Sequence, residues 1–232
     1  MSEGSVIVIG GTSGLGRDVA RRYVEKGSHV IITGRDLDRA TKVAAELAGD
    51  VEALAFDLSE PRSIAPALTA VGPVRYLVLA ALERDSNFIA DYDIDEALRL
   101  TTLKLIGYPE VVHTLKERLT ADACVVLFGG LALERPYPGS TTVTAVNGGV
   151  VGLVRTLAHQ LAPIRVNSIH PAFTSDTPFW RDKHDMLEER RQRTLTRRLP
   201  VAADITHAVE FLLENPSVNG INLYVDGGWV IN

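Results

Sequence analysis

Short apolar runs alternate with longer stretches of helical periodicity along the whole chain. The short runs are rich in β-branched residues and apolar at nearly every position, as strands covered by helices on both faces must be. This alternation is typical of parallel strands joined by crossover helices. It predicts strands at Val6–Ile9, His29–Thr33, Val51–Phe56, Tyr76–Ala80, Ala123–Phe128, Arg165–Ile169 and Asn222–Val225.

The longer stretches predict six helices between these strands. Gly27 and Gly49 follow two of them, at positions where glycine commonly ends a helix. The helices are expected near Gly14–Lys26, Asp38–Ala48, Ser63–Ala70, Ile94–Leu119, Thr141–Leu161 and Ala203–Glu214. A chain of 232 residues, 46% of them hydrophobic, suits one α/β domain. We therefore expect residues 1–232 to form one doubly wound, seven-stranded parallel sheet with helices on both faces.

The segment at about 174–200 interrupts the alternation. It carries Trp180 and a dense run of charges after the sixth strand, where an α/β sheet often places a mobile flap over its site. From Arg181 to Arg198 it holds seven Lys/Arg and four Asp/Glu. Such an excess of positive charge would attract an anionic substrate, but the simpler explanation is a solvated helix with ion pairs such as Glu188 with Arg191. Trp180 could wall the site or fasten the flap to the core.

Net charge and composition favour small molecules as partners. The formal charge is -5, and nucleic acid and acidic lipid surfaces are bound mainly through excess Lys and Arg. No stretch approaches the roughly 20 apolar residues that span a bilayer, and residues 1–5 show no basic cluster. The single cysteine, Cys124, lies in an apolar run and is expected to be buried. We expect a cytoplasmic protein without nucleic-acid, membrane or metal sites.

A glycine-rich turn follows the first predicted strand and leads into a helix. Gly10 permits a tight turn, Gly14 lets a pyrophosphate approach the N–H groups at the positive helix end, and Gly16 allows close packing of helix on strand. This context is the one that a Rossmann-type dinucleotide site requires. The residues expected to touch the cofactor here are Gly10, Thr12, Ser13, Gly14, Leu15 and Gly16.

The end of the second strand indicates which nucleotide is preferred. A carboxylate there would bind the ribose 2′-hydroxyl and repel a 2′-phosphate, but the chain has Gly34 followed by Arg35. A guanidinium is a planar fork suited to phosphate oxygens, so NADP(H) is favoured over NAD(H). Alternatively, Arg35 is a solvated loop residue neutralised by Asp36 or Asp38. Asp57, after the third strand, could accept from the adenine amino group or cap the following turn.

Several motifs together resemble those of the short-chain dehydrogenase/reductases over nearly the whole length of the chain. Besides the glycine turn they are Phe56-Asp57-Leu58, Ile164-Arg165-Val166-Asn167-Ser168-Ile169-His170-Pro171, Leu199-Pro200-Val201-Ala202-Ala203-Asp204-Ile205 and Asn219-Gly220-Ile221-Asn222-Leu223-Tyr224-Val225-Asp226-Gly227-Gly228. The resemblance implies a nicotinamide cofactor across the strand ends and a homodimer or homotetramer. It further implies cofactor contacts from Leu58, Ala80, Ala81, Pro171 and Thr177, although Ala172 replaces the glycine that usually follows the proline.

The catalytic positions of that family are changed in this chain. In the family, a tyrosine protonates the substrate oxygen, a lysine four residues later lowers the tyrosine pKa, and a serine polarises the carbonyl. Alignment from Gly152–Ala158 places Val143 at the tyrosine position, Asn147 at the lysine position and Gly130 at the serine position. Lys104 stands where the family has an asparagine. Ordinary ketone reduction is therefore expected to be poor.

Few groups could replace the missing acid. Lys104 and Tyr108 are four residues apart, so they would share a helix face and could bring an ammonium near a phenol. Alternatively, they are incidental surface residues. Pro109 is expected to distort the helix at this point. Asn147 could still bind the nicotinamide ribose. His170 is expected to be a packed strand-end histidine more readily than an acid.

Three functions are compatible with this pattern. The first is an NADP(H)-dependent oxidoreductase whose substrate needs no tyrosine, such as a protonated imine, because hydride addition to a cationic carbon leaves no oxyanion. The second is a non-catalytic NADP(H) sensor or partner subunit. The third is a lyase or isomerase with a structural nucleotide, which no particular residue favours.

Overall fold

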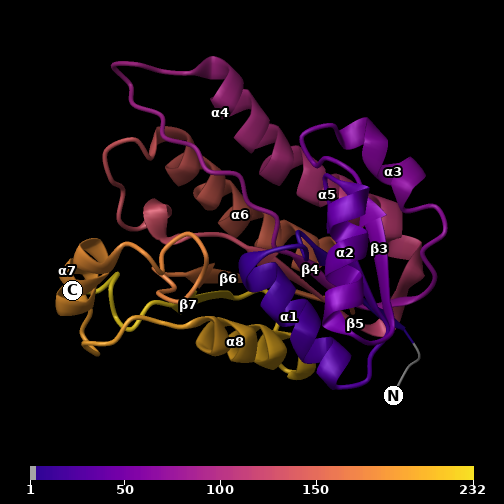
Figure 1. Ribbon diagram of the computed structural model, residues 1–232. Coiled ribbons are helices and arrows are strands. Elements are labelled where there is room, and N and C mark those ends of the chain that lie inside the picture. The colour runs from indigo at the N-terminus through magenta and orange to yellow at the C-terminus, as the bar shows by residue number, and fades with distance from the viewer. Residues whose placement is uncertain (1–3) are drawn as a thin grey trace.

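The structure is a computed structural model that describes residues 4–232. Seven strands form one parallel sheet in the order β3-β2-β1-β4-β5-β6-β7 (Figure 1). The chain crosses from one half of the sheet to the other between β3 and β4, so the fold is the doubly wound one that the sequence predicts. The strands are β1 Ser5–Ile9, β2 Val30–Gly34, β3 Val51–Ala55, β4 Val74–Leu79, β5 Leu119–Phe128, β6 Arg165–Pro171 and β7 Asn222–Val225.

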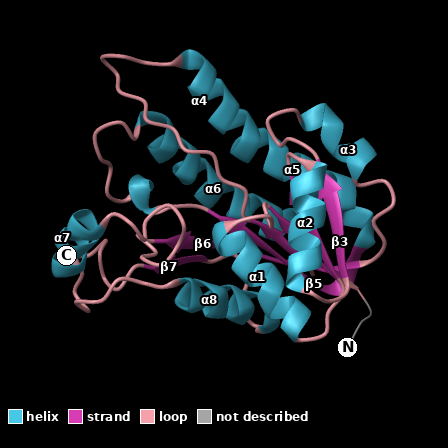
Figure 2. Cartoon of the chain, viewed as in Figure 1, coloured by secondary structure: helices cyan, strands magenta, loops and turns pink. Residues whose placement is uncertain are grey.

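Helices cover both faces of the sheet (Figure 2). Helices α1 (Gly14–Glu25), α2 (Leu37–Leu47) and α8 (Ala202–Glu214) cover one face. The other face is covered by α3 (Ile64–Ala67), α5 (Tyr108–Leu115) and α6 (Thr141–Gln160), and α4 (Ile94–Thr101) packs against α6. A separate hydrophobic cluster lies under each layer, which explains why β1 and β4 are buried on both sides.

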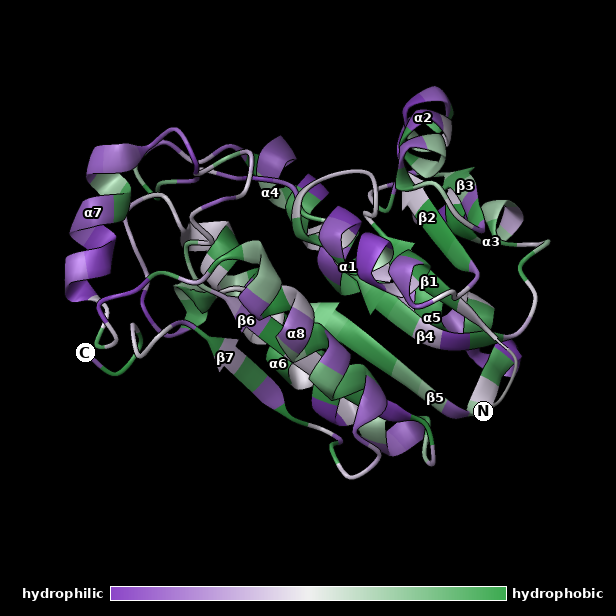
Figure 3. Cartoon of the chain, turned by 60° about the horizontal axis from the view of Figure 1, so that its bottom comes forward, coloured by the Kyte–Doolittle hydropathy of each residue, from purple (hydrophilic) through white to green (hydrophobic). Residues whose placement is uncertain are grey.

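Polarity separates the sheet from the flap. Figure 3 shows apolar central strands and a largely hydrophilic helix α7 (His184–Arg193) at the edge of the molecule. Within α7 only Leu187 is buried. The expected ion pair forms, with Arg191 donating to Glu188 at 2.6 Å. The sequence predicts either a mobile flap or a solvated helix at about 174–200, and the structure places the solvated helix α7 in this segment.

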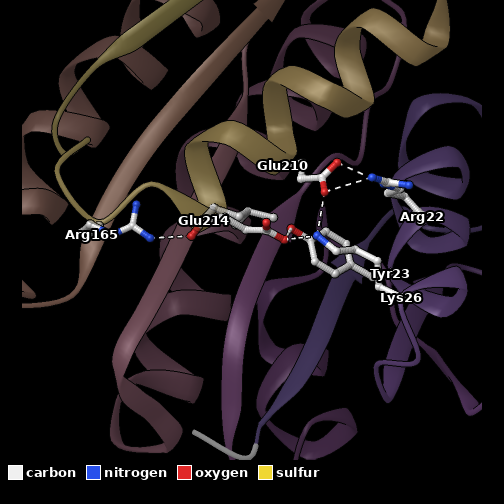
Figure 4. A network of polar contacts seen from close by, with 7 residues as sticks. Arg22, Tyr23, Lys26, Arg165, Glu210 and Glu214 are labelled. Atoms are coloured by element: carbon white, nitrogen blue, oxygen red, sulfur yellow. Dashed lines mark hydrogen bonds and ion pairs between the residues drawn. The ribbon is translucent and has the colours of Figure 1, made fainter. Parts of the chain in front are cut away.

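Helices α1 and α8 lie side by side and are joined by charged groups (Figure 4). Arg22 and Lys26 of α1 pair with Glu210 of α8, at 3.0 and 2.6 Å. Tyr23 donates to Glu214 at 3.2 Å, and burial raises the pKa of this tyrosine. This network aligns α8 with the helix that follows the glycine turn.

Two predicted helices differ from the structure. The helix expected at Ser63–Ala70 is reduced to a 3₁₀ turn, Pro61–Ser63, and the four residues of α3. The helix ends after Ala67, where the Thr69 hydroxyl donates to the Ala65 and Pro66 carbonyls and competes with the backbone N–H groups. The helix expected at Ile94–Leu119 ends earlier, because Leu119 already begins β5. Strand ends differ by up to four residues, the largest being the start of β5.

The long helix before β5 contains a π-helical segment. Residues Thr102–Gly107 separate α4 from α5, directly before Pro109, which confirms the expected distortion. Gly107 ends this segment, and a Cβ added there would lie 2.5 Å from the Leu58 carbonyl oxygen. Because Leu58 belongs to the loop after β3, this glycine lets the distorted helix approach the ligand edge of the sheet.

A methyl group at position 107 should destabilise the protein. We expect Gly107→Ala to lower the free energy of unfolding by about 1–3 kcal/mol, because the overlap with Leu58 is with a backbone atom that cannot easily move. Gly148→Ala in α6 is the matched control, since an added Cβ there meets nothing within 4 Å. That variant should be about 0.5–1 kcal/mol more stable than wild type. Urea unfolding measures both, and equal effects would contradict the contact.

Candidate functional site

The glycine turn brings β1, β4 and α1 into close contact. Gly10 adopts a positive φ of 86°, and a Cβ on it would lie 2.7 Å from the backbone of Ala81. A Cβ on Gly16 would overlap the Gly10 carbonyl oxygen and lie 3.4 Å from the Ala80 side chain. Both glycines are thus required by backbone contacts, and they place Ala80 and Ala81 beside the turn as the sequence predicts.

The start of α1 is open to an anion. Gly14 has a φ of 51°, and nothing lies within 4 Å of the position of its absent Cβ. In the described chain, the first turn of α1 carries no acidic residue, and the side chain of Ser13 does not cap it. The first N–H groups of the helix therefore remain available to a pyrophosphate.

Arg35 lies at the carboxyl end of β2 and is largely exposed. Its guanidinium is 3.3 Å from Glu83, which comes from the loop after β4. The sequence-based alternative, neutralisation by Asp36 or Asp38, is wrong in its partners, because Asp36 instead accepts from Arg39 N as the cap of α2. A Cβ on Gly34 would lie 2.8 Å from the Thr12 side chain, so Thr12 packs against the end of β2, next to Arg35 in sequence.

Asp57 closes the turn after β3. Its Oδ1 accepts from Ser59 N at 2.8 Å, and its Oδ2 accepts from Arg99 of α4 at 2.9 Å. Hydrogen bonds from Ser59 and Arg99 lower the pKa of this carboxyl despite its partial burial. The turn-capping role is confirmed, while contact with adenine stays a prediction. Arg99 also pairs with Glu83 at 2.7 Å, and so joins Asp57 to the partner of Arg35.

The end of β5 faces the middle of α6. A Cβ on Gly130 would lie 2.8 Å from Nδ2 of Asn147, which is buried. Val143 is half-buried one helical turn before Asn147 on α6. Positions 130 and 147 are therefore neighbours, as the alignment to the family's serine and lysine requires. No hydroxyl or ammonium is carried by these three side chains.

Lys104 is a buried ammonium within the π-helical segment. Only 2% of its surface is exposed, and Nζ donates to the Phe128 carbonyl at the end of β5 at 2.6 Å. Burial lowers the pKa of Lys104 to about 8. Among residues 4–232 it has no carboxylate partner. The interpretation of Lys104 as an incidental surface residue is wrong.

Tyr108 is buried beside it and is bound to the end of β4. The Lys104 ammonium lies 5.5 Å from the centre of the Tyr108 ring, which confirms their predicted proximity. The phenol donates to the Ala81 carbonyl at 2.7 Å. Burial raises the pKa of Tyr108, so its hydroxyl keeps its proton at neutral pH. The two side chains thus hold the ends of β5 and β4.

His170 is the packed strand-end histidine that the sequence predicts. Nδ1 accepts from Gly130 N at 3.2 Å, and Nε2 lies 2.9 Å from Ser168 Oγ, which donates to Asn222. The His170 ring fills the space that a side chain at position 129 would need, because a Cβ on Gly129 would overlap the ring. Burial lowers the pKa of His170 and favours the neutral ring. His170 thereby anchors the Gly129–Gly130 turn.

The remaining predicted positions lie along the same edge of the sheet. Leu58 is buried against Gly107, and Pro171 is the last residue of β6. Thr177 is buried, and its hydroxyl donates to the Thr174 carbonyl at 2.8 Å.

Two predictions from composition can also be compared with the structure. Cys124 is buried as expected, and burial raises the pKa of its thiol to about 11. No helix in the described part of the chain is long and apolar enough to cross a membrane.

Sequence reasoning missed the charged groups of the loop after β4. Glu83 links Arg35 to Arg99, and the Arg84 guanidinium lies 3.2 Å from the centre of the Phe179 ring in the flap. The signal was present as three consecutive charged residues, Glu83-Arg84-Asp85, directly after an apolar strand. The sequence gives no sign of their partners, because Arg35 lies 48 residues before Glu83 and Phe179 lies 95 residues after Arg84.

Comparisons with known proteins agree with this geometry. Residues 10–230 match the family described as enoyl-(acyl carrier protein) reductase. The chain is 30% identical to a 3-oxoacyl-[acyl-carrier-protein] reductase of Mus musculus over 95% of both chains, and 26% identical to carbonyl reductase family member 4 of Danio rerio over 96% of both.

Solved structures show the same architecture. A short chain dehydrogenase/reductase family protein superposes with a TM-score of 0.87 and 28% identity over 99% of both chains. The MalC reductase/Diels-Alderase of Malbranchea aurantiaca gives a TM-score of 0.91 over 100% of this chain and 97% of its own, and at 24% identity it shows the fold alone.

The sheet, the glycine turn and these likenesses define an oxidoreductase that uses a nicotinamide cofactor. The chain belongs to the short-chain dehydrogenase/reductase family.

The buried ammonium should make stability depend on pH. The pKa of Lys104 is about 8 in the folded protein and near 10.5 when unfolded, so the unfolded chain binds the proton more tightly between these values. Wild type should therefore gain stability relative to Lys104→Met as the pH rises from 8 to 10.5, by up to about 3 kcal/mol.

Chemical unfolding at pH 7.5 and pH 10 measures this difference. Lys116→Met, which removes an exposed lysine, is the control and should show no such gain. A constant difference between wild type and Lys104→Met across this range would show that Lys104 is not a buried cation.

Proposed function

We propose that the protein is an NADP(H)-dependent oxidoreductase that acts without the family's serine–tyrosine–lysine set. The observation that carries this proposal is the contact between Gly130 and Asn147, with Val143 one turn away. This contact supports the register in which these residues replace the serine, lysine and tyrosine. A positioned general acid contributes about 10²- to 10⁴-fold, so a substrate whose reduction leaves an oxyanion should react slowly.

The described residues fit a nicotinamide dinucleotide. The open N-terminus of α1, with Gly14 and Gly16, would hold the pyrophosphate, and Thr12 with Arg35 would flank the 2′-phosphate. Ala80, Ala81 and Leu58 would line the path of the adenosine half, and Pro171 and Thr177 that of the nicotinamide half. When bound, the cofactor supplies a hydride. The buried amide of Asn147 is placed to hydrogen-bond the nicotinamide ribose.

The substrate class that best suits this site is a protonated imine. Hydride addition to a cationic carbon gives a neutral amine, so no donor is needed at a developing oxyanion. Lys104 and Tyr108 donate to the Phe128 and Ala81 carbonyls and are buried behind the strand ends. We therefore assign them to the floor of the site, where they position the ends of β4 and β5, and not to proton transfer.

The non-catalytic sensor is the second candidate, and the likeness to reductases over almost the full chain does not favour it. We further propose a homodimer or homotetramer that takes a small-molecule substrate and works in the cytoplasm. Light scattering of the purified protein would establish the number of subunits.

Arg35 should determine the preference between nucleotides. Because a charge-assisted contact with the 2′-phosphate contributes about 1.5–3 kcal/mol, Arg35→Met should weaken NADPH binding by about 10- to 100-fold. NADH binding should change less than about twofold, since NADH lacks that phosphate. Arg39→Met, in the first turn of α2, is the control and should leave both affinities nearly unchanged. Calorimetry gives the constants, and equal losses for NADPH and NADH would refute the assignment.

Turnover should follow the chemistry of the substrate. With NADPH, wild type should reduce 2-methyl-1-pyrroline at least about tenfold faster than cyclopentanone or cyclohexenone, since only the imine needs no acid at oxygen. The triple variant Gly130→Ser, Val143→Tyr and Asn147→Lys should raise ketone reduction by about tenfold or more.

Absorbance at 340 nm follows both reactions. Gly130→Ser alone is a poor test, because the new side chain meets the Asn147 amide. Tight NADPH binding without oxidation by any of the three substrates would favour the sensor, and a folded triple variant without gain would refute the register.

A further inference from the structure

Four aromatic side chains form a continuous cluster where the flap meets the carboxyl end of β6. Phe179 contacts Trp180 edge to face at 4.6 Å between ring centres, and Phe173 contacts Trp180 at 5.1 Å and Trp229 at 5.7 Å. Phe173 follows Pro171, the end of β6, by two residues. The cluster therefore lies at the edge of the sheet where ligands of this fold bind.

Four cationic side chains lie against these rings. Arg84 and Lys183 are 3.2 and 3.4 Å from the centre of Phe179. Arg190 lies 5.2 Å from both Phe173 and Trp229, and Arg135 lies 4.4 Å from Trp229. Arg84 comes from the loop after β4 and Arg135 from the loop after β5, so three crossover connections contribute to one cation–aromatic cluster.

In the described part of the chain, none of these four cations pairs with a carboxylate, whereas most other arginines of the flap do; Arg197 instead donates to the Gln192 carbonyl. Within residues 4–232, the carboxylates pair instead with the arginines that lie outside the cluster: Arg191 with Glu188, Arg193 with Glu189, and Arg198 with Asp204. Asp85, next to Arg84 in sequence, makes no ion pair with it. In addition, Nε of Arg190 is buried without a hydrogen-bond partner.

This arrangement leaves like charges close together without a carboxylate to offset their repulsion. Contact of a cation with an aromatic face contributes only about 0.5–2 kcal/mol, and four like charges gathered in one place repel one another. Burial also lowers the pKa of Arg84, which reflects the cost of its charge there. An anion placed among the guanidinium groups would relieve this repulsion, and the rings would contact an adjoining planar group.

We propose that the cation–aromatic cluster binds the negatively charged group of the substrate, a carboxylate or phosphate attached to a planar or apolar part. This inference rests on the proposed function, because it places the charged end of that substrate beside the nicotinamide end of the crevice. A protonated imine that carries a carboxylate satisfies both requirements. The flap would then select substrates by charge, while the β5–α6 region determines the reaction.

Both tryptophans of the chain belong to the cluster, so their fluorescence reports its occupancy directly. The probes are benzoate, phenyl phosphate and the neutral isostere benzamide, titrated at fixed ionic strength into wild type saturated with NADP⁺. At least one of the two anions should bind about tenfold or more tightly than benzamide. The better of the two identifies the preferred anionic group.

Two substitutions test the cations themselves. Arg84→Met and Lys183→Met should each weaken binding of the preferred anion by about tenfold, the equivalent of about 1.4 kcal/mol, and leave benzamide within about twofold. Arg193→Met is the matched control, because it removes the same charge from the same flap but outside the cluster. It should change neither affinity by more than about twofold.

The outcome separates this inference from the proposed function. NADPH affinity, measured on the same samples, tests the nucleotide site, and circular dichroism verifies that each variant is folded. Anion binding that depends on Arg84 would support the cluster even if NADPH failed to bind. Equal affinity for anions and benzamide, or equal losses in Arg84→Met and Arg193→Met, would overturn the inference while leaving the nucleotide site intact.

Discussion

Helix α1 approaches the turn after β1 so closely that no side chain fits between them. A Cβ on Gly16 would overlap the Gly10 carbonyl, and one on Gly10 would meet the backbone of Ala81 at the end of β4. This contact directs the N–H groups of the first helical turn toward the edge of the sheet where β1 and β4 diverge. The position of every other group in the site is set relative to that edge.

Charge is distributed unevenly along this edge. At the β2–β3 end, Asp57 and Glu83 share Arg99, and Glu83 also contacts Arg35, so positive and negative groups nearly balance. At the flap end, the cations of the cation–aromatic cluster have no carboxylate partners in the described chain. Between them, the floor holds the buried ammonium of Lys104. Cations without a carboxylate partner thus gather at the flap end of a chain whose net charge is -5.

The fold follows closely from the sequence because buried parallel strands and their crossover helices leave a strong periodic pattern. Two helices differ from the predicted pattern for local reasons. The Thr69 hydroxyl bonds to two carbonyls of α3 where that helix ends, and the π-helical segment was visible only as Pro109 in a helical pattern. The glycine turn was predicted well, since its meaning depends on neighbours in sequence.

The rest of the site depends on contacts between distant residues. Glu83 as the partner of Arg35, the ring of His170 in the place of a side chain at Gly129, and the burial of Lys104 all require tertiary packing. Lys104 was expected to be an incidental surface residue because lysine is rarely buried without a partner. Lys104 lies in the π-helical segment Thr102–Gly107, and its ammonium reaches the Phe128 carbonyl from there.

The most direct test of the account is a crystal structure of the protein grown with NADP⁺. We expect electron density for the pyrophosphate at the N-terminus of α1, for the 2′-phosphate within hydrogen-bond distance of the Arg35 guanidinium, and for the nicotinamide ribose beside Asn147. Density that placed the nucleotide elsewhere, or an empty crevice at saturating nucleotide, would contradict it.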